Sequence, residues 1–276
     1  MSGRRNRTRA QLAQNLFANE ASARTLVGLA GTAPGDRVYD LGAGSGAVTE
    51  ALLRAGARVV AVERDPNLAH KLRARFAGRP VTVVEADLRE VRFRPPFKVV
   101  ANPPFNLTAD LLRRLLEGVS PPDAATLVLQ REAAERCAGV RRLSAVALEA
   151  LPWFDLSVAR PFARHDFTPR PSVDVAVLRI VRRPAPDLGE PEREAWRAFV
   201  RQALARPRPD AWHTFRGLVS NLQWRRLSTD LGIEPGALRA NLSYAQWLGI
   251  YRFVRTSAPV RVQRRLTAPP ERRRNP

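Results

Sequence analysis

The residues best suited to chemistry in this 276-residue chain stand where apolar runs end. The first group is a glycine-rich segment in which Asp40 is followed by Gly42, Gly44 and Gly46, between a strand pattern and a helical pattern. Glycines in such a turn permit positive φ and let the backbone approach a ligand closely. The G-x-G-x-G spacing differs from the G-x-G-x-x-G of pyrophosphate-binding sites, which disfavours an NAD site. The alternative is a purely structural glycine turn.

Acidic residues end the next two strand patterns. Glu63 lies 23 residues after Asp40, close to the spacing of about 20 at which a carboxylate accepts hydrogen bonds from ribose hydroxyls. Asp87 follows the third strand pattern, where it could accept a hydrogen bond from the exocyclic amine of a bound adenine. The alternatives are an exposed strand end paired with Arg64 for Glu63, and a helix N-cap for Asp87. Together with the glycine turn, they predict a nucleoside-type cofactor at the carboxyl ends of the strands.

The segment Asn102-Pro103-Pro104-Phe105 ends the fourth strand pattern. Two consecutive prolines cannot continue a central strand, because each lacks the N–H donor and fixes φ, so the chain must leave the sheet in a rigid turn. The Asn102 side-chain oxygen and a nearby carbonyl would then offer two acceptors to a planar –NH₂ group, with Phe105 as a stacking surface. Such a site would direct the amine lone pair at an electrophile. The alternative is a structural loop with a buried phenylalanine.

Seven strand patterns must position these residues. We expect strands over 38–41, 58–63, 80–85, 97–101, 125–130, 153–160 and 173–182, and helices over 47–55, 66–77, 107–118 and 132–149. The alternation of strand and helix predicts an α/β, Rossmann-like fold with a mostly parallel sheet covered on both faces. The last two strands have no helical pattern between them and should form an antiparallel pair at one edge.

The composition changes near residues 182–186, and four parts follow from it. We expect an arginine-rich arm with cap helices over 1–35, the sheet domain over 36–183, a small all-α domain over 184–256 that binds nucleic acid, and a basic disordered tail over 257–276. Within the third part, helical patterns cover 191–205, 212–220, 223–231, 235–240 and 243–254. The chain from residue 184 onward carries 17 arginines against eight acidic residues, so this part is strongly basic.

The whole chain is also basic, with 46 Lys and Arg residues against 26 Asp and Glu and a net charge of +20. A preference for Arg over Lys is typical of GC-rich coding, but a net charge of this size costs stability through self-repulsion. We therefore expect a polyanionic partner, nucleic acid before an anionic membrane surface, with a merely solvated basic exterior as the third reading.

Cysteine and histidine are scarce. A single cysteine and three scattered histidines predict neither a disulfide framework nor a metal site. No run of about 18 apolar residues and no secretory signal is apparent. We expect a cytoplasmic protein without a membrane span.

These motifs resemble a known family. The D-L-G-x-G-x-G, E-x-D and N-P-P-F series is similar to that of S-adenosylmethionine-dependent amino methyltransferases. The Gln14-Asn15-Leu16-Phe17 segment resembles the Q-N-F-L element of the ribosomal-RNA adenine N6-methyltransferases, and Phe167 to Asp174 resembles their F-x-P-x-P-K-V-[DN] element. The resemblance covers residues 10–254 and implies the class I methyltransferase fold, S-adenosylmethionine as cofactor and ribosomal RNA as partner of the enzyme. We expect the enzyme to be a monomer.

The resemblance also implies roles for individual residues. Gln14 and Asn15 would line the methionine end of the cofactor with Asp40, Gly42 and Gly44, while Glu63 would hold the ribose and Asp87 the cofactor adenine. Asn102 would orient the target N6 amine, and Phe105 and Phe167 would sandwich the target base. The sequence departs from the family pattern at Pro103, where Ile or Leu is usual, in the Leu16-Phe17 order, and at Ser172, where Lys is usual. Pro103 leaves open whether one or two methyl groups are added.

Two branches of this family compete. One branch dimethylates small-subunit RNA during ribosome assembly, and the other, the Erm macrolide-resistance type, modifies an adenine in the peptidyl-transferase loop of 23S RNA. The basic, arginine-rich composition and the Gln-Arg-Glu stretch at 130–132 favour the Erm type. The remaining alternatives are a DNA adenine or protein glutamine methyltransferase, a non-enzymatic RNA- or DNA-binding factor on the same fold, and an NAD-dependent oxidoreductase.

Overall fold

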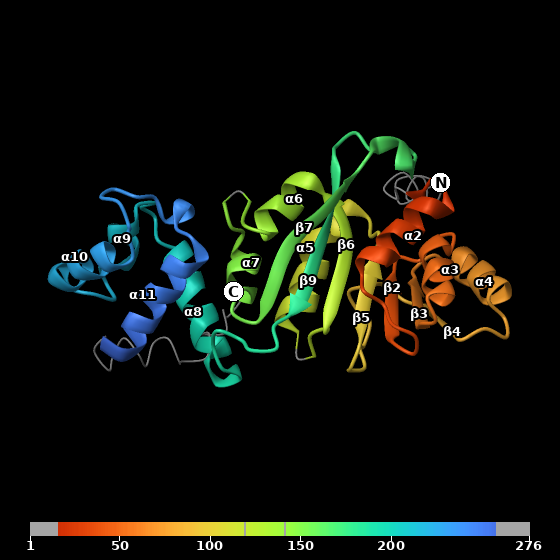
Figure 1. Ribbon diagram of the computed structural model, residues 1–276, viewed down its shortest axis with the longest axis horizontal. Coiled ribbons are helices and arrows are strands. Elements are labelled where there is room, and N and C mark those ends of the chain that lie inside the picture. The colour runs from red at the N-terminus through yellow and green to blue at the C-terminus, as the bar shows by residue number, and fades with distance from the viewer. Residues whose placement is uncertain (1–15, 119, 141, 258–276) are drawn as a thin grey trace, which may run out of the picture. The chain divides into compact units, whose positions relative to one another are not determined.

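The computed structural model describes residues 16–118, 120–140 and 142–257 (Figure 1). Its contacts divide the chain into two compact units. The first, the sheet unit, comprises the described residues up to Ala138 together with Phe154–Pro184, and the second, the helical unit, comprises Gly139–Trp153 together with the described residues from Ala185 onward. The segment 139–153, which the sequence analysis placed in the sheet domain, therefore belongs to the helical unit.

The sheet unit is built on seven strands in the order β4-β3-β2-β5-β6-β9-β7. Their bounds are β2 Arg37–Leu41, β3 Arg58–Glu63, β4 Val81–Glu85, β5 Lys98–Ala101, β6 Ala124–Gln130, β7 Phe154–Phe162 and β9 Val175–Arg182. The first five pair in parallel, whereas β9 runs antiparallel to both β6 and β7. The predicted α/β fold with seven strands and an antiparallel edge pair is confirmed. Parallel pairing brings the carboxyl ends of β2, β3, β4 and β5 to one edge of the sheet.

Helices cover both faces of this sheet because successive strand residues point to opposite sides. The helices are α2 Glu20–Leu29, α3 Ala47–Arg54, α4 Pro66–Arg75, α5 Thr108–Glu117 and α6 Arg131–Cys137 (Figure 1). Val38 of β2 belongs to a buried cluster with residues of α2 and α3. The next residue, Tyr39, contacts the Phe93 ring, over which Arg114 of α5 lies. One side of β2 thus packs against α2 and α3, and the other packs against Phe93 in the segment that lies beside α5.

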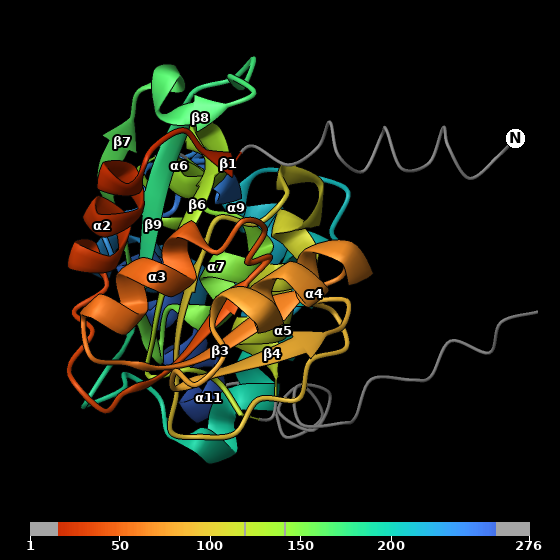
Figure 2. The same ribbon diagram turned by 90° about the vertical axis from the view of Figure 1, so that its right-hand side faces the viewer.

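A second, two-stranded sheet joins segments far apart in the sequence. β1 (Leu16–Phe17) pairs antiparallel with β8 (Phe167–Thr168), and the two strands lie side by side in Figure 2. The sequence analysis expected an arm with cap helices over 1–35 and no strand there, and α2 accounts for part of that range. Because a strand of two residues shows no periodicity, the sequence pattern could not predict this pairing.

The helical unit contains α7 Ala145–Ala150, α8 Arg193–Leu204, α9 Ala211–Phe215, α10 Asn221–Asp230 and α11 Tyr244–Ser257. Its core is aromatic: Phe199 stacks on Phe215 at 5.7 Å and meets Trp247 edge-on at 5.9 Å. Trp196 donates its indole N–H to the Leu148 carbonyl at 3.0 Å, which ties α8 to the segment before β7. This hydrogen bond is one of the contacts between α7 and α8 within the helical unit.

Two predicted helices are wrong as drawn from the sequence. The helix expected over 132–149 is interrupted: α6 ends at Cys137, Gly139 adopts φ +74°, and α7 starts anew with the Ser144 side chain as its N-cap. The helix expected over 235–240 is a loop followed by a single 3-10 turn at Arg239–Asn241. Pro235 and Gly236, the latter at φ +76°, prevent a regular helix at that point.

Candidate active site at the carboxyl end of the sheet

The glycine turn has the geometry that its composition predicts. β2 ends at Leu41, and Gly42, Gly44 and Gly46 adopt φ values of +83°, +55° and +85° before α3 begins. Residues other than glycine rarely adopt this positive-φ backbone conformation. The turn is anchored to the neighbouring strand, because the N–H groups of Gly42 and Ala43 donate to the Val62 carbonyl at 2.9 and 3.0 Å.

Two buried carboxyl groups lie beneath this turn. Asp40 is 1% exposed and accepts a hydrogen bond of 2.6 Å from the Thr49 hydroxyl of α3. Burial, reinforced by the nearby Glu63 carboxylate and opposed by the Thr49 hydrogen bond, raises the pKa of Asp40 to about 7. Asp40 therefore changes its charge in the neutral range, in the strand that leads into the glycine turn.

Glu63 lies at the end of β3 and is 2% exposed. One of its oxygens accepts a hydrogen bond from the Gly44 N–H at 2.9 Å and the other from the Asp65 N–H at 2.9 Å. The alternative in which Glu63 is an exposed strand end paired with Arg64 is wrong, since the nearby guanidinium of Arg64 lies 3.7 Å from Asp87 instead. A carboxylate has about four acceptor positions, so Glu63 holds the glycine turn and keeps capacity for further hydroxyl donors.

Asp87 follows β4 at the same edge of the sheet. Its carboxylate accepts hydrogen bonds from the Arg89 guanidinium at 2.9 and 2.7 Å and from the Arg89 backbone N–H at 2.9 Å. These contacts lower the pKa of Asp87 to about 2. The carboxylate is thus charged and already engaged by arginine, a partner that the sequence analysis did not foresee.

The Asn102-Pro103-Pro104-Phe105 turn follows β5 and lies against the glycine turn. A Cβ atom built on Gly42 would be 3.7 Å from Pro104 Cδ and 3.9 Å from Pro103 Cα. Asn102 is half-buried, with its Oδ1 shielded from solvent, and Pro103 is buried. A 3-10 turn, Phe105–Leu107, then leads into α5. The structure therefore brings together the two motifs that the sequence analysis selected for chemistry.

The two predicted aromatic walls differ in exposure. Phe105 is half-buried at the edge of the main hydrophobic cluster, whereas Phe167 is 1% exposed. Phe17 stacks on Phe167 with ring centroids 5.3 Å apart and an interplanar angle of 25°, and Phe162 meets Phe167 edge-on at 5.8 Å. The expected sandwich of a base directly between Phe105 and Phe167 is therefore not presented by this structure, because Phe17 covers a face of the Phe167 ring.

The β1–β8 pairing places Phe17 directly opposite Phe167. The sequence analysis cited Phe17 as part of the segment from Gln14 to Phe17 that resembles the family's Q-N-F-L element, but gave it no role. Leu16, the residue before it, lies over the glycine turn, since its Cδ2 would be 2.8 Å from a Cβ atom on Gly44. The predicted cofactor residues Gln14 and Asn15 lie outside the described residues, as do the rest of residues 1–15 of the predicted arm and residues 258–276 of the predicted tail.

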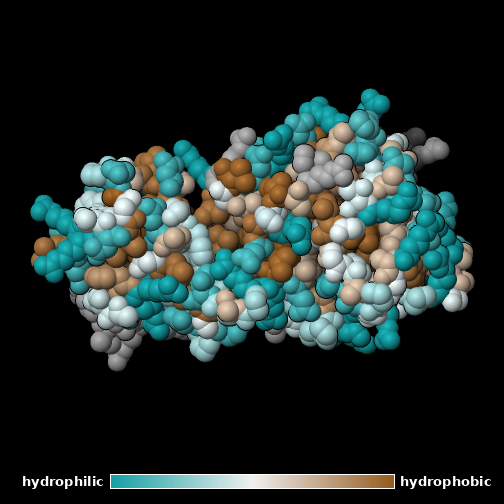
Figure 3. Space-filling view, viewed as in Figure 1, coloured by the Kyte–Doolittle hydropathy of each residue, from teal (hydrophilic) through white to brown (hydrophobic). Residues whose placement is uncertain are grey.

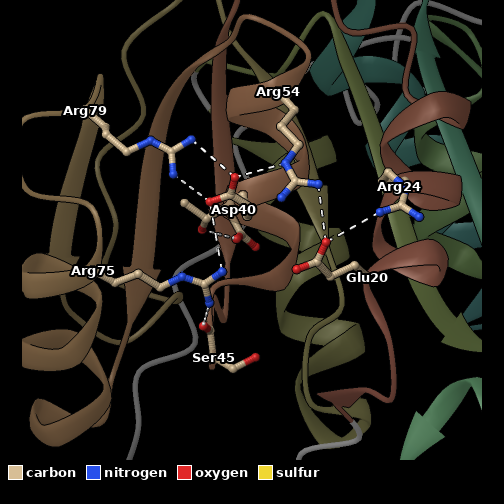
Figure 4. A network of polar contacts seen from close by, with 9 residues as sticks. Glu20, Arg24, Asp40, Ser45, Arg54, Arg75 and Arg79 are labelled. Carbon is tan, nitrogen blue, oxygen red and sulfur yellow. Dashed lines mark hydrogen bonds and ion pairs between the residues drawn. The ribbon is translucent and has the colours of Figure 1, made fainter.

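An arginine network supports the glycine turn from its outer side (Figure 4). Glu50 of α3 pairs with Arg79 at 2.6 Å and with Arg54 at 3.1 Å. Arg75 of α4 donates a hydrogen bond of 2.8 Å to the Ser45 carbonyl inside the turn. These contacts join α3, α4 and the turn, and hydrophilic residues cover the same region on the right of Figure 3. Arginines held in this way position the turn in addition to adding positive charge.

In the described parts of the chain, no group of three or more His, Cys, Asp and Glu side chains is arranged to hold a metal ion. None of the helices in those parts is both long and apolar enough to cross a bilayer.

Comparison with known proteins gives these motifs a context. The chain is 32% identical over 255 residues to the mycinamicin-resistance protein MyrB of Micromonospora griseorubida, covering 90% of this chain and 79% of MyrB. It is 35% identical over 206 residues to a ribosomal RNA small subunit methyltransferase A of Prosthecochloris aestuarii, covering 72% of this chain and 77% of that protein.

Among solved structures, the 23S rRNA methyltransferase ErmE is similar with a TM-score of 0.79 and 27% identity, covering 87% of this chain and 99% of that of ErmE. These likenesses confirm the class I methyltransferase fold and the resemblance to adenine N6-methyltransferases of ribosomal RNA, the Erm type included. The ribosomal RNA adenine dimethylase family model matches residues 5–256. The chain therefore belongs to the ribosomal RNA adenine dimethylase family, whose members are methyltransferases.

Proposed function

We propose that this protein transfers a methyl group from S-adenosylmethionine to the N6 amine of an adenine in 23S ribosomal RNA, and so confers resistance to macrolide-type antibiotics. The observation that carries the proposal is the proximity of the glycine turn to the Asn102-Pro103-Pro104-Phe105 turn, since only the space of one Cβ atom separates Gly42 from the two prolines. In open α/β sheets, ligands bind at the carboxyl ends of strands. Here a turn suited to a nucleoside cofactor touches a turn suited to an exocyclic amine.

The donor set at this edge fits S-adenosylmethionine. Glu63 lies beneath the turn with acceptor capacity left for ribose hydroxyls, and a Cβ atom on Gly42 would stand in ordinary contact distance of the proline turn. Asp87 lies after β4, where it would accept a hydrogen bond from the adenine amine beside its contacts with Arg89. Asp40, Gly42 and Gly44 would surround the methionine end with Gln14 and Asn15.

Bound S-adenosylmethionine supplies an electrophilic methyl group on a sulfonium. Asn102 Oδ1 would accept a hydrogen bond from the N6 amine and direct the nitrogen lone pair toward that methyl carbon. Transfer to the amine that Asn102 orients would form the N–C bond as the C–S bond breaks, and the methylated amine would then lose a proton to solvent. Positioning supplies most of the acceleration in such a displacement.

The adenine must leave its stack to reach this site, which favours bases in loops and bulges. Phe105, half-buried at the mouth of the turn, would stack on the extruded base. Phe167 would act indirectly, by holding the ring of Phe17 in place. The two ring centroids are 5.3 Å apart. The basic surface would provide phosphate contacts that set the register of the RNA but carry little sequence information.

Two relatives support different target RNAs. MyrB, a mycinamicin-resistance protein, is 32% identical over 90% of this chain, and ErmE, a 23S rRNA methyltransferase, is similar with a TM-score of 0.79. The net charge of +20 also agrees with an enzyme that must capture naked RNA. The second candidate, methylation of small-subunit RNA, is favoured by the 35% identity to a small-subunit methyltransferase.

The deciding experiment incubates the full chain and isotopically labelled S-adenosylmethionine with protein-free 23S and 16S RNA from a susceptible bacterium. Nuclease fragments are then mapped by mass spectrometry, which also counts the methyl groups on each adenine. We expect label on one adenine of the peptidyl-transferase loop of 23S RNA. Label confined to 16S RNA would establish the second candidate, and RNA binding without any transfer would leave a non-enzymatic RNA-binding factor.

A further inference from the structure

The helical unit contains a cavity that the proposed methyl transfer does not use. Its volume is about 300 Å³, and it lies between α9, α10 and the loop that follows α10. The side chains that matter for recognition are Trp212, Asn221, Trp224, Arg225 and Glu234. The volume stands at the lower end of the range of small-ligand pockets, which suits a single planar group.

One wall of this cavity is aromatic. Trp212 and Trp224 contact each other with ring centroids 6.1 Å apart and an interplanar angle of 40°. Trp224 also stacks on Phe215 at 5.9 Å and 26°, and Phe215 is fully buried. The indole wall is therefore fixed by the core of the unit. A rigid aromatic surface of this kind loses little conformational entropy when a flat ligand stacks on it.

These two indoles differ from the other tryptophans of the chain. Trp153, Trp196 and Trp247 are at most 2% exposed, whereas Trp212 and Trp224 are only half-buried. On the face shown in Figure 3, apolar residues interrupt the hydrophilic surface around α9 and α10 at the left. The core of the unit already contains its own tryptophans, so stability alone does not require two further indoles at a cavity.

The rim of the cavity is polar and basic. The side chains of Asn221, Arg225 and Glu234 line the cavity, and those of Arg225 and Glu234 carry opposite charges. Residues 205–240 carry six arginines against three carboxylates. The rim can therefore donate and accept hydrogen bonds at the edge of a bound group while the surroundings attract a polyanion.

From this combination we infer that the cavity binds one unpaired nucleobase of the substrate RNA, outside the methyl-transfer site. Single-stranded RNA is recognised by stacking of its bases on aromatic side chains, with hydrogen bonds to their edges and cationic contacts to the backbone. The indole wall, the Asn221 and Glu234 side chains, and Arg225 supply these three elements. The inference rests on the proposed function in that it takes RNA as the substrate.

The test uses tryptophan fluorescence of the full chain, because a base stacked on Trp212 or Trp224 quenches their emission. The probes are a ten-nucleotide oligoadenylate, an abasic ribose-phosphate chain of the same length, and AMP. We expect saturable quenching by the oligoadenylate, little by the abasic chain, and weaker binding of AMP, which lacks the chain phosphates. Equal quenching by the abasic chain, or AMP binding as tight as that of the oligonucleotide, would overturn the inference.

Substitutions on α9 and α10 show whether the fluorescence quenching comes from binding in the cavity. Loss of one stacking partner weakens binding by about 5- to 150-fold, so Trp212→Leu should weaken oligoadenylate binding within this range and Trp212→Phe should restore most of it. Leu222→Ala is the matched control, because Leu222 is 63% exposed on α10 and does not line the cavity. The wild-type quenching needs no variant, so the inference stays falsifiable if Trp212→Leu fails to fold.

Methyl transfer to rRNA is measured separately on the same preparations. If the chain methylates rRNA but shows no base-dependent quenching, the cavity site is refuted and the proposed function stands. If the chain shows the quenching but transfers no methyl group, the cavity site stands and the proposed function is refuted.

Discussion

The buried Asp40 should make the stability of this protein depend on pH in the neutral range. Its pKa rises from 3.8 to about 7 on folding, and such a shift corresponds to about 4 kcal/mol. Because the folded-state value lies above the unfolded-state value, the folded state binds the proton more tightly. The contribution of Asp40 is fully favourable below pH 4 and is lost as the pH rises to about 7.

Asp40→Asn should remove this dependence while it keeps an oxygen that accepts the Thr49 hydroxyl. The two pKa values of Asp40 imply that the wild type loses about 2 to 3 kcal/mol of unfolding free energy relative to the variant as the pH rises from 5 to 8. The assay is urea unfolding of both chains at several pH values, with the exposed Asp230→Asn as control. A stability difference that does not vary with pH would refute a neutral-range pKa for Asp40.

Three further predictions concern the cofactor, the glycine turn and the arm. Glu63→Gln removes the charge that accepts the Gly44 N–H, and S-adenosylmethionine binding measured by calorimetry should weaken by about 10- to 100-fold; an unchanged Kd would make Glu63 purely structural. Gly44→Ala forces a Cβ onto φ +55° and should lower the unfolding free energy by about 1 to 2 kcal/mol, whereas Gly28→Ala, inside α2 with open space around it, should raise it by about 0.5 to 1 kcal/mol; equal effects in urea unfolding would contradict the strain. Removal of residues 1–9, with four arginines, should weaken RNA binding and flatten its log–log salt slope by up to about 0.9 per lost phosphate contact, and filter binding at several salt concentrations would expose an unchanged slope.

The sheet and the placement of the two motif turns could be predicted because their signals are local and repeated. Each strand of the parallel sheet carries its own apolar run, and parallel pairing brings the carboxyl ends of these runs to one edge. Gly42 and Pro104, 62 residues apart, therefore meet without any signal specific to their contact. The family resemblance added roles to residues that the topology had already grouped.

The aromatic arrangement could not be predicted in the same way. β1 and β8 are two residues each and pair across a separation of 150 residues, so no periodic pattern marks them. The stack of Phe17 on Phe167, and hence the burial of Phe167, follows from this non-local pairing. An aromatic residue in each of two family-like elements was the available signal, and it did not specify contact.

The pairing of Asp87 with Arg89 could not be predicted because the chain is so rich in arginine. With 46 Lys and Arg residues in the chain, nearly every carboxylate has a cation close in sequence, and Arg89 was one of several near Asp87.

Helix ends were missed for a different reason. Gly139 interrupts an otherwise continuous helical pattern through its φ of +74°, a conformation that glycine permits but does not require.

The central claim is that the turn containing Asn102 directs an adenine amine at the methyl donor. Single-turnover methyl transfer to 23S RNA by Asn102→Ala, compared with Asn106→Ala at an exposed position of the 3-10 turn that follows, tests it most directly. We predict a rate at least about 100-fold lower for Asn102→Ala, with its Kd for S-adenosylmethionine nearly unchanged, and a normal rate for Asn106→Ala. A near-normal rate for Asn102→Ala would contradict the account.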